Sequence, residues 1–458
     1  MFVLIGVVAG CGAHKAQLPS RALQLHVGSG HKPSTRARLE VTVINGDTNV
    51  RVRGARVRIG RLGDATDWHG VAKIVVRRRT ALNVTVQANG FTTRTLRELF
   101  QLHRKVTIRL YRPSLQWPMY GASPLRSQAH ATIRLRPPFR VVWSAGVGSL
   151  VEFPAVVSDG VAYIGNLNGV VFALSMRTGK LHWKHRTPNG KMAASPAVWH
   201  DQLIVHGMDG HVWALDRATG QLRWHFTIGS PVESSPVVVD GIDYFGAWNG
   251  MLYALDVRTH ALRWSRWLGA KITSSVAVAD GSLYLGDYGG RVWALSARTG
   301  STRWVSSVNG RVYGTPAVSE RRVFIPSSDG GSVTAFSTGG RYLWSVNTGS
   351  YVYSSPAVSD GRVFFGSYNG LFYAVSASSG RVLWTVGMGG PISGAAVVVD
   401  GVAYAGSFAH QIVGVDARSG RVLLRFPHGE YVPVSGNGSR LLLHGFSTLY
   451  AVEPLHRR

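Results

Sequence analysis

The chain has 458 residues, with 50 Lys and Arg against 23 Asp and Glu, and a formal net charge of +27 at pH 7. A hydrophobic content of 45% is that of a folded protein, and a single cysteine excludes a fold held by disulfide bonds. The charge is uneven, because residues 1–140 hold 24 basic and 5 acidic residues.

The first eleven residues resemble a bacterial lipoprotein signal. Residues 1–10 are apolar and end in Val8-Ala9-Gly10-Cys11, a pattern similar to a lipobox in which Cys11 is acylated. Ten residues are too few to span a bilayer, which takes about 20 in a helix. The usual positively charged start is absent, which indicates a truncated signal. A short apolar start with a chance cysteine is the alternative.

Residues 12–36 are polar and basic and are predicted to be a flexible tether. Residues 37–111 are predicted to form a small β-sandwich, because short runs alternate apolar and polar residues without helical spacing. The stretches that resemble a carboxypeptidase-regulatory or transthyretin-like domain are Gly54–Val57, Thr66–Ala72 and Ala88–Phe91. This resemblance implies a non-catalytic module for contact.

Residues 112–136 are predicted to be a linker that leads into a repeat array over 137–454, with 455–458 as a tail. In the array a tryptophan recurs at steps of 40 or 41 residues, at Trp143, Trp183, Trp224, Trp264, Trp304, Trp344 and Trp384. Each unit contains four short apolar runs separated by Gly, Asp or Asn turns, which is the pattern of a β-propeller blade.

The two ends of the array predict how the propeller closes. The segment 137–149 contains a fourth strand that no first three strands precede, and the residues after Leu424 supply three strands without a fourth. Pairing the two ends closes a ring of eight blades and removes exposed strand edges. The predicted fold is therefore all-β, an eight-bladed propeller after a small sandwich. We expect the seven tryptophans to be structural, filling the space between neighbouring blades.

The motif Ala214-x-Asp216-x-x-Thr219-Gly220-x-x-x-Trp224 resembles the repeat of pyrroloquinoline-quinone-type propellers. That family includes quinoprotein alcohol dehydrogenases and non-enzymatic members such as the lipoprotein BamB of the outer-membrane barrel assembly machine. In the dehydrogenases, as the resemblance implies, the quinone (PQQ) lies at the axial mouth beside a disulfide of adjacent cysteines and a calcium ion. Cys11 is the only cysteine here and lies outside the array, so we expect no cofactor and keep PQQ with calcium as the alternative.

Other catalytic or metal-binding patterns are weak. His206 and His211 flank one turn, but without a third ligand we interpret them as solvated turn residues. No nucleophile elbow, phosphate-binding loop or zinc-protease motif occurs. We assign no catalytic or metal-ligating residue.

Two rings of residues are candidate binding positions. The first strand of each blade should line the central channel, where most aligned residues are small and the exceptions are Glu152, Glu233, Tyr313 and Tyr353. The turns before the third strands carry amides, a carboxylate and aromatic residues, namely Trp248, Asn249, Asp287, Tyr288, Tyr368, Asn369 and Phe408. Aromatic rings among amides suit a peptide or sugar surface. Channel water and ordinary turn propensity are the alternatives.

The predicted function is a non-catalytic, exported, lipid-anchored envelope protein that binds or assembles protein or glycan partners, at the cell surface or in the periplasm. Its basic N-terminal region would add attraction to anionic lipid, although the excess of arginine is also typical of a GC-rich genome. We expect no nucleic acid partner, because Arg77-Arg78-Arg79 is the only basic triplet. A quinone-dependent dehydrogenase and a BamB-like assembly factor are the alternatives.

Overall fold

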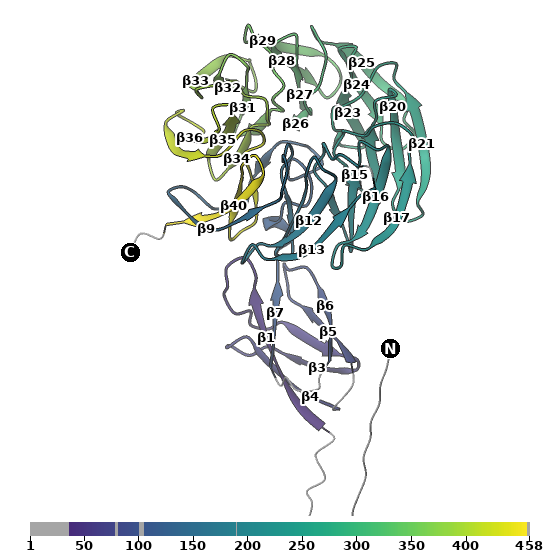
Figure 1. Ribbon diagram of the computed structural model, residues 1–458, viewed down its shortest axis with the longest axis vertical. Coiled ribbons are helices and arrows are strands. Elements are labelled where there is room, and N and C mark those ends of the chain that lie inside the picture. Colours follow the sequence, from purple (N-terminus) through teal and green to yellow (C-terminus); the bar gives the residue numbers. More distant parts are fainter. Residues whose placement is uncertain (1–35, 78–80, 100–104, 189, 456–458) are drawn as a thin grey trace, which may run out of the picture.

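The computed structural model describes residues 36–77, 81–99, 105–188 and 190–455. A ring of β-sheets lies above a smaller β domain formed by the N-terminal part of the chain (Figure 1). Cys11 and residues 12–35 of the predicted tether lie outside the described residues, so lipidation stays a prediction. Within the described ranges, no helix is both long and apolar enough to cross a membrane.

The N-terminal domain is a sandwich of two sheets. One sheet has the order β4-β1-β7 and the other β3-β2-β5-β6. Alternate residues such as Leu39, Val41 and Val43 point into a shared core, as period-two alternation requires. The strands are β1 Arg36–Asn45, β2 Arg56–Ile59, β3 Leu62–Ala65, β4 Val71–Arg77, β5 Ala81–Gln87, β6 Arg94–Leu99 and β7 Lys105–Leu110.

The propeller has eight blades, as predicted, and each is a four-stranded antiparallel sheet. Blade 1 consists of β10 Val156–Ser158, β11 Val161–Gly165, β12 Val170–Ser175 and β13 Leu181–Arg186, and blade 2 of β14 Ala197–Trp199, β15 Gln202–His206, β16 His211–Asp216 and β17 Leu222–Thr227. Blade 3 consists of β18 Val238–Val239, β19 Ile242–Gly246, β20 Met251–Asp256 and β21 Ala261–Trp267, and blade 4 of β22 Ala277–Ala279, β23 Ser282–Gly286, β24 Arg291–Ser296 and β25 Thr302–Ser307.

Blade 5 consists of β26 Ala317–Ser319, β27 Arg322–Ser327, β28 Ser332–Ser337 and β29 Tyr342–Asn347, and blade 6 of β30 Ala357–Ser359, β31 Arg362–Gly366, β32 Leu371–Ser376 and β33 Val382–Gly387. Blade 7 consists of β34 Val397–Val399, β35 Val402–Ser407, β36 Gln411–Asp416 and β37 Val422–Pro427, and blade 8 of β38 Val434–Gly436, β39 Leu441–His444, β40 Thr448–Pro454 and β9 Phe139–Gly146. A short strand, β8 Ala129–His130, adds to blade 7 in parallel with β34.

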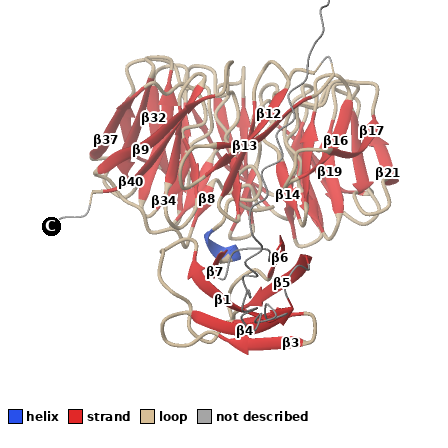
Figure 2. Cartoon of the chain, turned by 60° about the horizontal axis from the view of Figure 1, so that its bottom comes forward, coloured by secondary structure: helices blue, strands red, loops and turns tan. Residues whose placement is uncertain are grey.

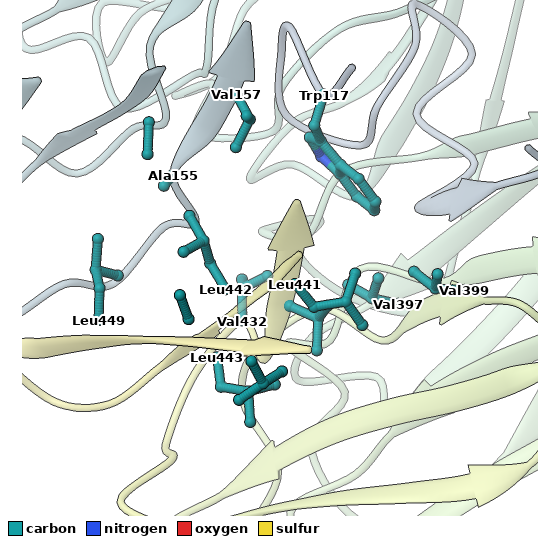
Figure 3. Packing of buried hydrophobic residues seen from close by; sticks show 14 of the residues in the cluster. Trp117, Ala155, Val157, Val397, Val399, Val432, Leu441, Leu442, Leu443 and Leu449 are labelled. Atoms are coloured by element: carbon teal, nitrogen blue, oxygen red, sulfur yellow. The ribbon is translucent and has the colours of Figure 1, made fainter. Parts of the chain in front are cut away.

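Blade 8 closes the ring by combining both ends of the array, which confirms the predicted closure. β40 pairs antiparallel with β9, with Ala451 opposite Trp143, and Figure 1 shows the two strands side by side. A hydrophobic cluster joins blade 8 to blades 7 and 1 and includes Trp117, Val157, Val397 and Leu441 (Figure 3).

The blade tryptophans join each blade to the next. The Trp264 indole Nε1 donates to the Ala297 carbonyl of blade 4 at 3.1 Å. A Cβ at Gly300 of blade 4 would lie 2.8 Å from the Trp264 ring, so the ring lies against this glycine. The other tryptophans that donate to a main-chain carbonyl of the following blade are Trp143, Trp183, Trp304, Trp344 and Trp384.

Two departures from the repeat follow from this contact. His260 replaces the glycine facing Trp224, and the two rings stack with centroids 4.7 Å apart. Trp224 then donates to Gln202 of its own blade at 2.8 Å. Leu424 replaces the eighth tryptophan because the last two strands of blade 8 come from different chain segments, so no turn with a glycine joins them.

Residues 112–136 are packed inside the propeller, against the innermost strands, whereas the sequence predicted a linker. After the 3-10 helix η1 Pro113–Leu115, the segment accepts main-chain hydrogen bonds from the innermost strands of blades 1, 2, 4, 5, 6 and 7, at Val157, Val198, Val278, Val318, Val358 and Val398. The fully buried Arg126 donates to the carbonyls of Val276, Ser235 and Pro236. Burial lowers the pKa of Arg126 to about 10. This segment, called the plug below, fills the hub.

The sandwich lies on one flat face of the propeller (Figure 2). Tyr111 packs against Gly160, in the turn between the first two strands of blade 1. Gln116 links the domains, since its Nε2 donates to Asp47 at 3.2 Å and its Oε1 accepts from the Asp159 main chain at 3.1 Å. The opposite face carries the turns between second and third strands and the connections between blades. It is called the rim face below.

Candidate functional site

Most residues of the two predicted rings belong to one surface at the centre of the rim face. In seven of the eight blades, a main-chain hydrogen bond joins the turn before the third strand to the connection that enters the same blade. Trp248 N donates to the Pro231 carbonyl at 3.0 Å and Tyr288 N to the Lys271 carbonyl at 2.9 Å. The same bond recurs in blades 1, 2, 5, 6 and 7, with Leu167, Met208, Ser328, Tyr368 and Phe408 as donors.

Channel-lining residues come from these connections, which corrects the prediction that the first strands provide them. The strands of blades 1, 3, 5 and 6 begin at Val156, Val238, Ala317 and Ala357, several residues later. Glu152, Glu233, Tyr313 and Tyr353 therefore stand on irregular backbone at the inner end of each blade. There they line one small cavity on the axis, called the axial cup below. Tyr120 of the plug also lines the cup.

A hydrogen-bond network joins the cup to the rim. The Tyr313 hydroxyl donates to Glu233 Oε1 at 2.6 Å and lies 3.4 Å from Glu152 Oε1. Trp248 Nε1 donates to Glu233 Oε2 at 3.0 Å. Burial, together with the nearby Glu233, raises the pKa of Glu152. Burial also raises the pKa of Tyr313, and both carboxylates add to that effect. Tyr313 therefore stays protonated and acts as a donor.

Aromatic side chains continue from the cup onto the rim face. Tyr353 contacts Tyr313, Tyr351 and Tyr368, with ring centroids 5.1 to 5.9 Å apart. Tyr368 packs edge-on against Phe408, and Phe408 against Tyr431. The result is a continuous aromatic arc over blades 5 to 8.

Two cations lie beside the cup. Lys271 Nζ lies 3.3 Å from the Trp248 ring centroid and 4.8 Å from that of Tyr288. Burial lowers the pKa of Lys271, while Glu233 acts to raise it. The Arg311 guanidinium lies 5.7 Å from the Tyr288 centroid and pairs with Asp329 through Nε at 2.9 Å.

Some predicted residues do not face the site. Asp287 is fully buried, and its carboxylate accepts from Gly289 N, Arg291 N and Trp293 Nε1 within its own turn. Asn249 and Asn369 donate to the hydroxyls of Tyr253 and Tyr373 in the same blades. For these three residues, turn propensity is the better explanation.

The sequence reasoning missed Lys271, Arg311, Tyr351 and Tyr431. They precede aligned channel positions by two residues, as Tyr351 precedes Tyr353 and Arg311 precedes Tyr313. Residues two apart in extended chain point to the same side, and this spacing was the available signal. The interpretation of His206 was wrong, because His206 is fully buried and bonds to Asp243 at 2.9 Å.

The cup does not fit a quinone cofactor. Its open volume is about 40 Å³, whereas sites for small organic molecules occupy about 300–1,000 Å³. Among the residues that the structure describes, no group of three His, Cys, Asp or Glu side chains is placed to hold a metal ion. The single cysteine of the chain also rules out a ring of two adjacent cysteines.

Comparison with known proteins supports the propeller assignment. The profile of the family described as outer membrane protein assembly factor BamB matches residues 139–271, 248–350 and 329–454. Outer membrane protein assembly factor BamB of Yersinia pestis is 31% identical over 125 residues, which are 24% of this chain and 32% of that protein. The chain thus aligns with about a third of the length of this relative.

Solved structures share the fold at low identity. BamB from Moraxella catarrhalis superposes with a TM-score of 0.60 at 17% identity, covering 70% of this chain and 99% of that one. Quinohemoprotein alcohol dehydrogenase from Comamonas testosteroni gives 0.64 at 14% identity, covering 75% and 81%. Because non-enzymatic and enzymatic structures match equally, these likenesses establish the fold alone.

Proposed function

This chain belongs to the family of outer membrane protein assembly factor BamB, and from that premise we propose that it is a non-catalytic envelope protein whose rim face docks a protein partner. The N-terminal sandwich, which resembles a carboxypeptidase-regulatory domain, then serves as a contact module on the opposite face. Acylation of Cys11 and the basic N-terminal region would hold the protein at a membrane surface.

The rim face itself carries the proposal. It presents an arc of large aromatic side chains in contact with one another, in which Tyr351 is 49% exposed. Trp248 on the same face is 38% exposed and lies against Lys271. Rigid aromatic groups beside cations are the residues that dominate protein interfaces, because they bury much area at little entropic cost. Among the described residues, the sandwich contacts the opposite face of the propeller through Tyr111 and Gln116, so the rim face is available to a second protein.

The lining of the cup, which does not fit a quinone with its calcium ion, supports a non-catalytic role. The cup offers two carboxylates and tyrosines in about 40 Å³, without the volume or ligands for a quinone and its calcium ion. A role in outer-membrane protein assembly, as the names of the relatives suggest, is the finer form of this proposal and requires an outer membrane. Glycan is the alternative partner.

Site-specific crosslinking in native envelopes tests the docking role. A photo-crosslinking amino acid at Tyr351 should give discrete protein adducts that mass spectrometry identifies. The same group at Val305, which is 51% exposed on an outer strand of blade 4, is the matched control. Equal adducts at both positions, or none at Tyr351, would reject the proposal. Adducts removed by glycosidases would replace the protein partner with a glycan.

The dehydrogenase alternative has its own test. The purified protein is mixed with pyrroloquinoline quinone and calcium, and its absorbance and dye reduction are followed. We expect neither a spectral change nor turnover. Stoichiometric quinone binding with dye reduction would overturn the non-catalytic assignment.

A further inference from the structure

We infer that the axial cup receives a primary ammonium group, the side chain of a lysine on the docked protein. This inference rests on the docking role proposed above and names the chemistry of one contact within it. The charge of the cup, the residues of its walls and its size each support this contact.

The carboxylates of the cup form no direct ion pair with a described residue, although Glu233 attracts Lys271 at longer range. Glu152 and Glu233 both lie within reach of the single hydroxyl of Tyr313, and Glu233 is only 7% exposed. Within the described ranges, neither carboxylate has a Lys, Arg or His nitrogen within 4.0 Å. Two like charges at one partly buried site repel each other, and a cation between them would remove that repulsion.

The two nearby cations are held elsewhere. Lys271 lies over the Trp248 ring at 3.3 Å from its centroid. Arg311 is bound to Asp329 through its Nε and through its main-chain N–H, at 2.9 and 2.6 Å. Both positions are stabilised by their own partners, so the cup carboxylates remain available to an external cation.

The walls suit a small cation. Tyr353, Tyr431 and Phe153 line the cup, and aromatic rings attract a desolvated ammonium group through their negative faces. Thr273 also lines it, is 5% exposed, and its hydroxyl makes no hydrogen bond to any residue that the structure describes. This hydroxyl supplies a third acceptor, which matches the three donors of an ammonium group.

The size selects among cations. A volume of about 40 Å³ holds a compact ammonium group, since one water needs about 10–15 Å³ by the same measure. A planar guanidinium with its five donors is larger and more rigid. Lysine is therefore preferred to arginine.

Saturation-transfer NMR on the purified full chain provides the test, with millimolar peptides. The probe is acetyl-Gly-Lys-Gly-amide, and the matched peptides carry norleucine, acetyl-lysine or arginine in place of lysine. We expect the lysine peptide to bind at least fivefold more tightly than the other three. Butylammonium ion is a further arm, and binding of this free amine as tight as that of the peptide would overturn a protein-borne lysine as the ligand.

Variants locate the binding. Glu152→Gln and Tyr353→Leu should each weaken binding of the lysine peptide at least fivefold, while Glu320→Gln, an exposed carboxylate paired with Arg322, should not change it. Circular dichroism verifies that each variant is folded. Unchanged affinity in Glu152→Gln, or equal binding of the lysine and norleucine peptides, would overturn the inference.

The two proposals fail separately. Crosslinks at Tyr351 that persist while the lysine peptide does not bind would reject the cup as a lysine receptor and keep the docking role. Absence of protein crosslinks from position 351 in a chain with an unaltered cup would reject the docking role itself.

Discussion

Each blade tryptophan and the glycine it covers in the next blade act as a pair. Gly300 has φ +68° and lies under the Trp264 ring. The glycine thus meets two demands, a left-handed backbone and close approach of an aromatic ring. Where His260 takes that place, the tryptophan turns to a partner in its own blade.

A matched pair of glycine substitutions separates these demands. Gly361 has the same φ of +68°, but a Cβ there would meet nothing within 4 Å. We expect Gly361→Ala to cost about 1–2 kcal/mol of unfolding free energy from backbone strain. Gly300→Ala should cost about 1–3 kcal/mol more, because its Cβ would clash with Trp264. Chemical denaturation measures both, and equal losses would contradict the pairing.

The raised pKa of Glu152 predicts that this residue affects stability in a pH-dependent way. Its pKa is raised in the folded state by burial and by Glu233, so its contribution to stability is present at low pH and is lost as pH rises through the folded pKa. Glu152→Gln should therefore raise the melting temperature at pH 7.5 and leave it unchanged near pH 4. Glu320→Gln is the control. An equal shift at both pH values would show that charge is not the cause.

Residue roles were the hardest to predict from sequence. Asp287 accepts hydrogen bonds from main-chain groups of its turn, and Asn249 donates to a tyrosine of its own blade. Side chains that face outward or inward at a turn have the same sequence pattern, so the sequence does not distinguish them. Glu152, Glu233, Tyr313 and Tyr353 were found because they interrupt a series of small residues, and all four line the cup.

At the level of the strand, the innermost connections form a chain of hydroxyl contacts around the hub. The main-chain N–H of Ser195 donates to Ser235 Oγ at 3.1 Å, and that of Ser235 to Ser275 Oγ at 2.8 Å. The series continues through Thr315 and Ser355. These small hydroxyl residues therefore bond one blade to the next.

Adjacent serines test this chain. Ser235→Ala leaves the buried N–H of Ser195 without an acceptor, which should cost about 1–3 kcal/mol. Ser234 is equally buried, but its hydroxyl has no partner among the described residues, so Ser234→Ala should be neutral or slightly stabilising. Thermal unfolding compares the two. A similar loss in both would contradict a role for the hydroxyl chain.

Elements were largely predictable because each blade repeats the same local pattern. The 40-residue tryptophan period and the Gly and Asp turns gave the number of blades and the closing pair. The plug was missed because its contacts are main-chain hydrogen bonds to six different blades, which leave no periodic signal in residues 112–136.

For the whole molecule, the seam between blades 8 and 1 contains a buried histidine. His444 Nε2 accepts from Ala155 N at 3.1 Å, and its Nδ1 donates to the Pro433 carbonyl at 3.2 Å. Both bonds together require the neutral ring. Complete burial lowers the pKa of His444 to about 4.

Acid should therefore weaken the ring at this seam. The folded pKa lies below the unfolded value of about 6.5, so the contribution of His444 is complete above that value and is lost as pH falls through about 4, in total about 3 kcal/mol. Denaturation from pH 7 to pH 4 should show a flatter profile for His444→Gln, although that variant is less stable at pH 7. His182→Gln, on an outer strand, is the control. An unaltered profile would exclude His444 as the cause.

Closure by β40 has a consequence during synthesis. β9 ends at Gly146 and its partner β40 begins at Thr448, so about three hundred residues must be translated before that strand edge is covered. Until that point the growing chain carries an open template for pairing with other chains. The uncovered edge of β9 is therefore a target for chaperones that shield β-edges, and folding of the ring is completed only when its final blade arrives.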